Sequence, residues 1–153
     1  MLDELEALYR ARLNEFRRVA AAIAGDRDLG GDAVQEAFAK AVRKRRSYRG
    51  RGPLEAWVWR IVVNAARDAR RARQPGDSAA GNGLLPARDG EPPVPAQLDL
   101  LTERQREIVF LHYYADLDYA AIADALAISP GTVGATLSAA RRTLRRAYEE
   151  VQA

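Results

Sequence analysis

Apolar residues recur every three or four positions in several stretches of the chain, which is the spacing of one face of an α-helix. The stretches cover residues 2–23, 32–45, 54–65, 102–113 and 119–146. No segment alternates polar and apolar residues as a half-buried strand does. The pattern therefore predicts an all-α fold. Within it, we expect the segment from Gly25 to Gly31 to end the first helix and Asp32 to open the second.

Residues 119–146 predict two helices joined by a tight turn. Ser129 is placed to cap the second helix, and Pro130 takes its first position, where a missing N–H costs nothing. Two short helices have too little surface to fold alone, so the preceding helix should support them. That helix opens with a capping box formed by Thr102 and Gln105.

Four arginines late in the second of these helices favour DNA binding by a helix-turn-helix: Arg141, Arg142, Arg145 and Arg146. In that motif the second helix enters the major groove. An αα-hairpin that only packs against its neighbours would show the same apolar pattern, and arginine is favoured near the end of any helix. The motif is therefore interpreted together with the rest of the chain.

The composition excludes several classes of site. The chain has no cysteine and one histidine, His112. It therefore offers no disulfide, no thiolate or histidine cluster for a metal, and no cysteine nucleophile. Asp26, Asp28 and Asp32 could be imagined around magnesium, but helix capping explains them more simply. We expect no catalytic residue, no metal and no cofactor.

Charge and composition divide the chain into three parts. Residues 1–73 carry 17 Lys and Arg against 10 Asp and Glu, whereas the segments 74–96 and 97–153 each have a net charge of −2. Segment 74–96 is rich in Gly and Pro, as a flexible linker is. We therefore expect two small helical domains, 1–73 and 97–153, with the first meeting a polyanion. The acidic start lacks a long apolar run, which predicts a cytoplasmic protein without membrane insertion.

Basic and aromatic residues alternate around the start of the third predicted helix. Residues 43–53 form a basic loop with Tyr48, and the helix that follows carries Trp57 and Trp59. Guanidinium groups hold phosphates, and aromatic rings stack on unpaired bases. This arrangement suits single-stranded nucleic acid, although the arginines could also form a solvated face. Trp57 falls in the apolar stripe, so we assign it to the core and leave Trp59 to the surface.

Four motifs in order along the chain resemble bacterial sigma factors of the extracytoplasmic-function (ECF) type, which retain conserved regions 2 and 4. Residues 32–38 (Asp-Ala-Val-Gln-Glu-Ala-Phe) are similar to the core-binding helix of region 2, and residues 54–64 are similar to its promoter-melting helix. Residues 101–107 and 119–123 resemble region 4. The resemblance covers nearly the whole chain outside the linker.

The resemblance implies a transcription initiation factor that binds the clamp and flap regions of core RNA polymerase and recognises promoter DNA. An anti-sigma factor is a further partner of many family members. The implied core-binding residues are Asp32, Gln35, Glu36 and Phe38. Those implied at the -10 element, where bases are extruded from the stack, are Tyr48, Arg49, Arg51, Trp59, Arg60 and Asn64, with Arg67, Arg70 and Arg71 on phosphates.

The -35 element is read as duplex by region 4, which implies contacts from Ser129, Thr132, Thr136, Ala139 and Arg142. The family usually has Lys or Arg at several positions where this helix has Gly134, Ala135, Thr136 and Ala139. Fewer phosphate contacts predict weak -35 binding, or binding led by thymine methyl groups. The competing interpretation is a stand-alone helix-turn-helix regulator, which would need a dimer surface or ligand pocket in residues 1–73. An enzyme acting on nucleic acid would need metal-binding carboxylates or a nucleophile–base pair.

Overall fold

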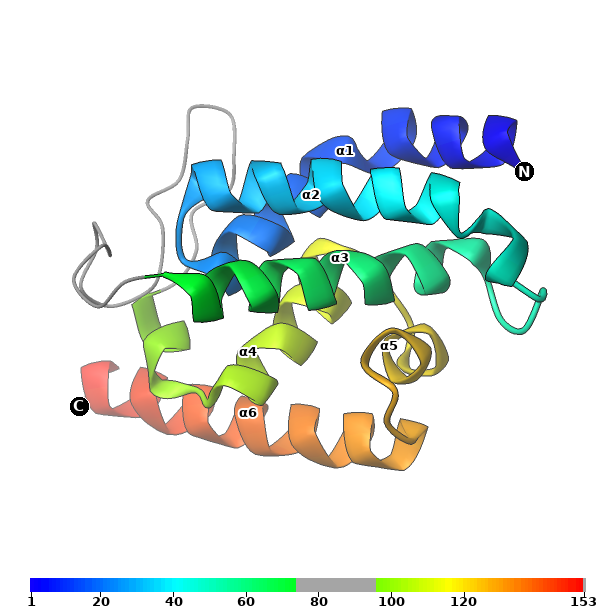
Figure 1. Ribbon diagram of the computed structural model, residues 1–153. Coiled ribbons are helices and arrows are strands. Elements are labelled where there is room, and N and C mark those ends of the chain that lie inside the picture. Colours follow the sequence, from blue (N-terminus) through cyan, green and yellow to red (C-terminus); the bar gives the residue numbers. More distant parts are fainter. Residues whose placement is uncertain (74–95, 153) are drawn as a thin grey trace.

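The computed structural model describes residues 1–73 and 96–152, and this part of the chain contains six α-helices, whose arrangement is drawn in Figure 1. They are α1 (Leu2–Ala24), α2 (Arg27–Arg43), α3 (Leu54–Ala72), α4 (Glu103–Val109), α5 (Tyr119–Leu126) and α6 (Pro130–Gln152). Three short segments join them: the 3₁₀ turns η1 (Arg45–Ser47) and η2 (Ala96–Leu100), and the π-helical η3 (Phe110–Tyr114). The described ranges contain no strand, which confirms the all-α prediction. The predicted linker lies outside them except for Ala96.

The helices form two groups with α3 between them. Figure 1 shows α1 and α2 above α3 and the helices α4, α5 and α6 below it. Phe16, Val34 and Trp59 fill the core of the first group, while Ile108, Ile122 and Leu137 fill that of the second. Buried side chains of both groups belong to one continuous apolar cluster. The second group therefore rests directly on α3.

The second helix begins earlier than the pattern predicts. Gly25 ends α1 in the left-handed conformation, with φ of 81°. Asp26 then caps α2 by accepting hydrogen bonds from the amides of Asp28 and Leu29, at 2.8 and 3.0 Å. The prediction that Gly25 to Gly31 interrupts the helices was wrong beyond Gly25, and so was a capping role for Asp32.

Close packing explains the glycine at position 30 of α2. A Cβ added to Gly30 would overlap the backbone of Ala21 and lie 2.9 Å from the carbonyl carbon of Ala20. Glycine lowers helix propensity by about 1 kcal/mol relative to alanine. Here it allows α1 and α2 to approach, and tertiary packing outweighs that cost.

The predicted caps of the second group are confirmed. Thr102 Oγ1 accepts from the Gln105 amide at 3.2 Å, and Gln105 Oε1 accepts from the Thr102 amide at 3.0 Å. Ser129 Oγ accepts from the Thr132 amide at 3.1 Å, and Pro130 is the first residue of α6. The turn before α6 contains Ala127 in the left-handed region, with φ of 57°. These features fix the helix-turn-helix formed by α5 and α6.

Taken one at a time, the helices of the described ranges are too short or too polar to cross a membrane. Taken together, α5 and α6 have the length and composition of a membrane span, although the pair is bent by 104° at its turn.

Candidate nucleic-acid interface

One face of α3 carries a row of polar side chains. Arg60, Asn64, Arg67 and Arg71 are spaced four, three and four residues apart, which places them on one side of the helix. Arg60, Asn64 and Arg71 are exposed, and Arg67 is partly buried. The structure therefore brings these predicted residues together as a basic surface.

Trp59 lies in the core, where the sequence predicted a surface residue, and Trp57 is packed against the core but is not fully buried. Trp59 is fully buried, with its ring 4.3 Å from that of Phe16 and its Nε1 donating to Glu55 Oε1 at 3.5 Å. It cannot stack on a base in this arrangement, so its assignment to the DNA surface was wrong. Trp57 is only partly buried, and its ring lies 5.5 Å from that of Tyr48.

The width of the buried face of α3 explains why Trp59 is buried. Because α3 lies between two layers, its buried residues include neighbouring pairs: Val58 with Trp59, and Val62 with Val63. A one-sided stripe drawn through Leu54, Trp57 and Ile61 misses this second face. The signal that could have found it is the spacing of Trp59 to Val63 and Ala66, four and three residues apart.

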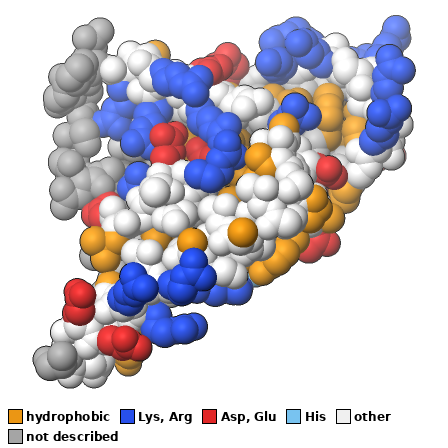
Figure 2. Space-filling model, turned by 90° about the horizontal axis from the view of Figure 1, so that it is seen from below, with side chains coloured by type: hydrophobic (Ala, Val, Ile, Leu, Met, Phe, Trp, Pro, Cys, Tyr) orange, Lys and Arg blue, Asp and Glu red, His pale blue; other side chains and the backbone are white. Residues whose placement is uncertain are grey.

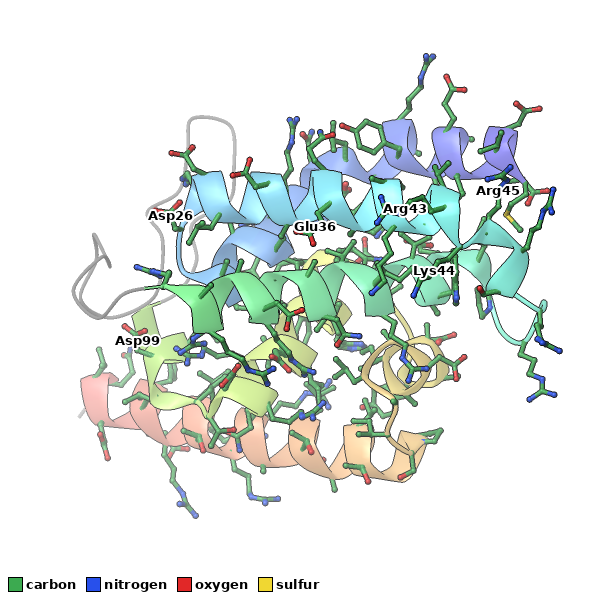
Figure 3. The ribbon with its side chains drawn as sticks, viewed as in Figure 1. Asp26, Glu36, Arg43, Lys44, Arg45 and Asp99 are labelled. Carbon is green, nitrogen blue, oxygen red and sulfur yellow. The ribbon has the colours of Figure 1, made fainter. Side chains whose placement is uncertain are left out.

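The loop before α3 is held by Tyr48. The Tyr48 hydroxyl donates to the carbonyl oxygen of Gly52 at 2.6 Å, which closes the loop. Gly50 and Gly52 both adopt φ of 76°, a conformation that favours glycine. Arg49 and Arg51 are exposed on this loop. Figure 3 shows a further basic group, Arg43, Lys44 and Arg45, where α2 ends nearby.

The last arginines of α3 are engaged by carboxylates. Arg67 Nε donates to Glu107 Oε2 at 2.9 Å, and Arg67 Nη2 donates to Glu107 Oε1. This hydrogen bonding raises the pKa of Arg67. Arg70 lies 3.8 Å from Glu103, and Arg71 lies 3.7 Å from Asp68. Neither contact with α4 was predictable from the sequence, because no local pattern relates residues 33 and 40 positions apart.

The predicted core-binding helix has one exposed polar face, but one of its predicted contact residues is buried. Asp32, Gln35 and Glu36 are exposed on α2, and Gln35 Nε2 donates to the Tyr9 hydroxyl at 2.8 Å. Figure 3 shows Glu36 partway along α2, between Asp26 at one end and Arg43 at the other. Phe38 is buried edge-on against Tyr9 and Phe16, with centroids 4.9 and 5.2 Å away. The assignment of Phe38 to a partner surface was therefore wrong, because its ring completes the core.

The helix-turn-helix presents a mostly uncharged entry. Thr132 is exposed, and Thr136 and Ala139 are half-buried farther along α6. Ser129 is engaged as the cap, with its Oγ 2.9 Å from Thr132 Oγ1. Arg142 is exposed beyond them. Figure 2, seen from the α6 side, shows Lys and Arg in separate groups with apolar surface between them.

Three further contacts join the second group to the first. Arg12 Nη2 donates to the carbonyl oxygen of Ala115, and the Arg18 guanidinium lies 4.3 Å from the centroid of the Tyr114 ring. A Cβ added to Gly52 would lie 2.6 Å from Asp124 Oδ2, so α5 approaches the loop before α3. The second group thus covers part of α3 and reaches the basic loop.

Two family profiles match the chain over most of its length. Residues 8–75 match sigma-70 region 2, and residues 93–144 match sigma-70 region 4. The first match contains α2, the basic loop and α3, and the second contains the capping box and the helix-turn-helix. The surfaces described above therefore lie within the matched segments.

Similar proteins carry the same description. The chain is 28% identical to the ECF RNA polymerase sigma factor SigM of Mycobacterium tuberculosis, over 94% of this chain and 75% of that one. It is 27% identical to the ECF RNA polymerase sigma factor EcfG of Rhodopseudomonas palustris, over 94% of this chain and 84% of that one. It is 29% identical to the RNA polymerase sigma-H factor of Pseudomonas aeruginosa, over 77% and 72%.

Solved structures share the fold. CnrH, in complex with the cytosolic domain of CnrY, superimposes with a TM-score of 0.74 at 19% identity, over 98% of this chain and 90% of that chain. RpoE from Bartonella quintana, in complex with the anti-sigma factor NepR, superimposes with a TM-score of 0.74 at 22% sequence identity, over 95% of this chain and 97% of that chain. With both conserved regions matched in order, the chain belongs to the sigma-70 family and is a sigma factor of the ECF type.

Proposed function

We propose that this transcription initiation factor holds core RNA polymerase through α2 and promoter DNA through α3 and α6. The observation that carries the proposal is the division of α2 into two faces. Phe38 and its neighbours are buried, while Asp32, Gln35 and Glu36 are exposed side by side. Exposed acidic and amide groups on a rigid helix suit a basic, hydrogen-bonding partner surface. The clamp of core polymerase is that partner in our proposal, and the flap would meet region 4.

At the -10 element, the proposed contacts come from α3 and the loop before it. Arg49, Arg51 and Arg60 supply exposed positive charge, and Asn64 supplies hydrogen-bonding groups. Trp57 replaces Trp59 as the proposed stacking residue, since Trp57 and Tyr48 form a partly buried aromatic pair beside the exposed arginines of the loop. We also propose that an anti-sigma factor regulates the chain, since solved neighbours include a sigma factor bound to one.

The core-binding proposal predicts that a Gln35→Ala, Glu36→Ala double variant loses stoichiometric co-purification with core polymerase. Truncating a cluster of contact residues at one interface commonly costs several kcal/mol, so retention should fall at least about tenfold. Both side chains are exposed, and the fold should therefore survive, as circular dichroism would verify.

The matched control is Glu6→Ala, Asn14→Ala, which removes one carboxylate and one amide from exposed positions of α1. It should bind polymerase like the wild type. Equal binding by both double variants would contradict the role of α2. A wild-type chain that binds promoter duplex tightly without polymerase would support the stand-alone regulator.

For the -35 element, we propose weak duplex binding led by apolar and hydroxyl contacts from Thr132, Thr136 and Ala139. Thr136→Arg, Ala139→Arg should therefore tighten binding of a -35 duplex and steepen its salt dependence, since each added phosphate contact releases counterions. Anisotropy titrations at several salt concentrations would measure this. Ser138→Arg, Ala120→Arg adds the same charge at other exposed positions and serves as control. A similar gain in duplex affinity in both double variants would show that Thr136 and Ala139 have no special role in -35 binding.

A further inference from the structure

Glu107 is the one charged side chain that is buried among the residues the structure describes, with 2% of its surface exposed. Both of its carboxylate oxygens accept hydrogen bonds from Arg67, at Nε and Nη2. One helical turn earlier, Glu103 points to the same helix and pairs with Arg70. Two carboxylates of α4 thus face two guanidinium groups of α3.

The geometry of this pairing matches that of phosphate recognition. The planar guanidinium fork binds a carboxylate or a phosphate through the same two parallel N–H groups. Arg67 uses two donors on Glu107, and its side chain is 19% exposed. A phosphate therefore cannot take up this position while Glu107 occupies it.

The contacts around the pair keep α4 in place. Arg12 binds the Ala115 carbonyl, and Arg18 lies over the Tyr114 ring, so α1 holds the segment that follows α4. In contrast, Arg60 and Asn64 remain exposed toward the start of α3. Within the basic surface, Arg67 is the partly buried residue, and it is the one whose guanidinium α4 engages with two hydrogen bonds.

We propose that the acidic face of α4, formed by Glu103 and Glu107, is an internal competitor for the phosphates of single-stranded promoter DNA. The closed chain then binds such DNA weakly, and withdrawal of α4 frees Arg67 and Arg70. This inference rests on the proposed phosphate role of the α3 arginines. It adds that region 4 controls access to region 2 through a carboxylate pair.

The energetics of a buried ion pair suit a reversible contact. The desolvation of two charges offsets much of their attraction, so the pair adds little net stability when both partners return to water. Removing only one partner has a larger effect, because the other is left buried and uncompensated. The pair can thus define the closed arrangement without making it permanent.

The test uses the full chain, which has no cysteine and can be labelled at introduced ones. Ala11→Cys on α1 and Ser138→Cys on α6 are exposed positions for a fluorescence energy-transfer pair. In this background, Glu107→Gln should increase the distance between the labels. It should also tighten binding of a fluorescein-labelled single-stranded oligonucleotide about tenfold, as the competent fraction rises. Glu150→Gln, an exposed change of the same charge, should do neither.

A charge exchange separates closure from phosphate binding. Arg67→Glu, Glu107→Arg keeps an ion pair, so it should restore the closed distance without the gain in oligonucleotide affinity. Wild-type distance and affinity in Glu107→Gln would overturn the competition. A larger label distance in Glu107→Gln without any gain in oligonucleotide affinity would also overturn the proposal, because Arg67 would then not bind phosphate. Polymerase co-purification reports on the proposed function independently.

A milder variant covers the case in which Glu107→Gln does not fold. Glu103→Gln removes a half-exposed carboxylate and leaves the buried pair intact. It should raise oligonucleotide affinity about threefold, since one of the two guanidinium groups is freed. No gain beyond that of Glu150→Gln would then overturn the proposal.

Discussion

Replacing Gly30 with alanine is expected to destabilise the chain by about 3 kcal/mol, because overpacking at a helix contact forces the backbones apart. The added Cβ would overlap backbone atoms of Ala21, and backbone cannot rotate away as a flexible side chain can. Urea unfolding followed by circular dichroism would measure the loss. The face of α2 proposed to bind polymerase should shift as well, so polymerase retention should fall in parallel.

The neighbouring glycine supplies the control. A Cβ added to Gly31 meets nothing within 4 Å. Gly31→Ala should therefore stabilise the helix by about 1 kcal/mol, the difference in helix propensity between the two residues. Changes of the same sign and size in the two variants would contradict the close approach of α1 and α2.

The two tryptophans should separate stability from DNA binding. Trp59→Ala empties the centre of the first group and is expected to cost about 3–5 kcal/mol. Trp57→Ala should cost much less stability but weaken single-strand binding about tenfold, in keeping with a stacking contribution of about 1–3 kcal/mol per base. Urea unfolding and oligonucleotide anisotropy measure the two effects.

Conservative replacements test the assignment further. Trp57→Phe retains an aromatic face and should recover most of the binding lost in Trp57→Ala. Weak binding by a well-folded Trp59→Phe, with Trp57→Ala unchanged, would return the stacking role to Trp59. Because Trp59 is fully buried, that result would also require region 2 to rearrange.

Local chemistry in the sequence predicted local structure well. The caps at Thr102 and Ser129 depend on residues only three positions away, so their spacing alone indicates them. The apolar periods likewise predicted the all-α fold and the helix-turn-helix. The order of the four motifs identified the family before any contact was known.

Features that depend on distant parts of the chain were not predicted. Gly30 reads as a helix breaker until the backbone of α1 is seen beside it. Trp59 has the pattern of a surface residue until Phe16 of α1 is found against it, and Glu107 has that of an ordinary helix acid until Arg67 is found opposite. Trp59 and Glu107 meet partners 43 and 40 positions away, and Ala21 meets Gly30 only because the chain turns back at Gly25, so no helical period relates these pairs.

The turn before α6 has a consequence for how region 4 meets duplex DNA. Ala127 takes a left-handed conformation, with φ of 57°, in which glycine would be at ease. An alanine there has fewer alternative conformations to lose than glycine, at the cost of local strain of about 1–2 kcal/mol. The strain persists because the buried side chains of both helices and the Ser129 cap hold the angle between α5 and α6. The helix pair can therefore enter a groove without first being ordered. This lowers the entropic cost of binding, which a helix with few charged residues could not easily offset by phosphate contacts.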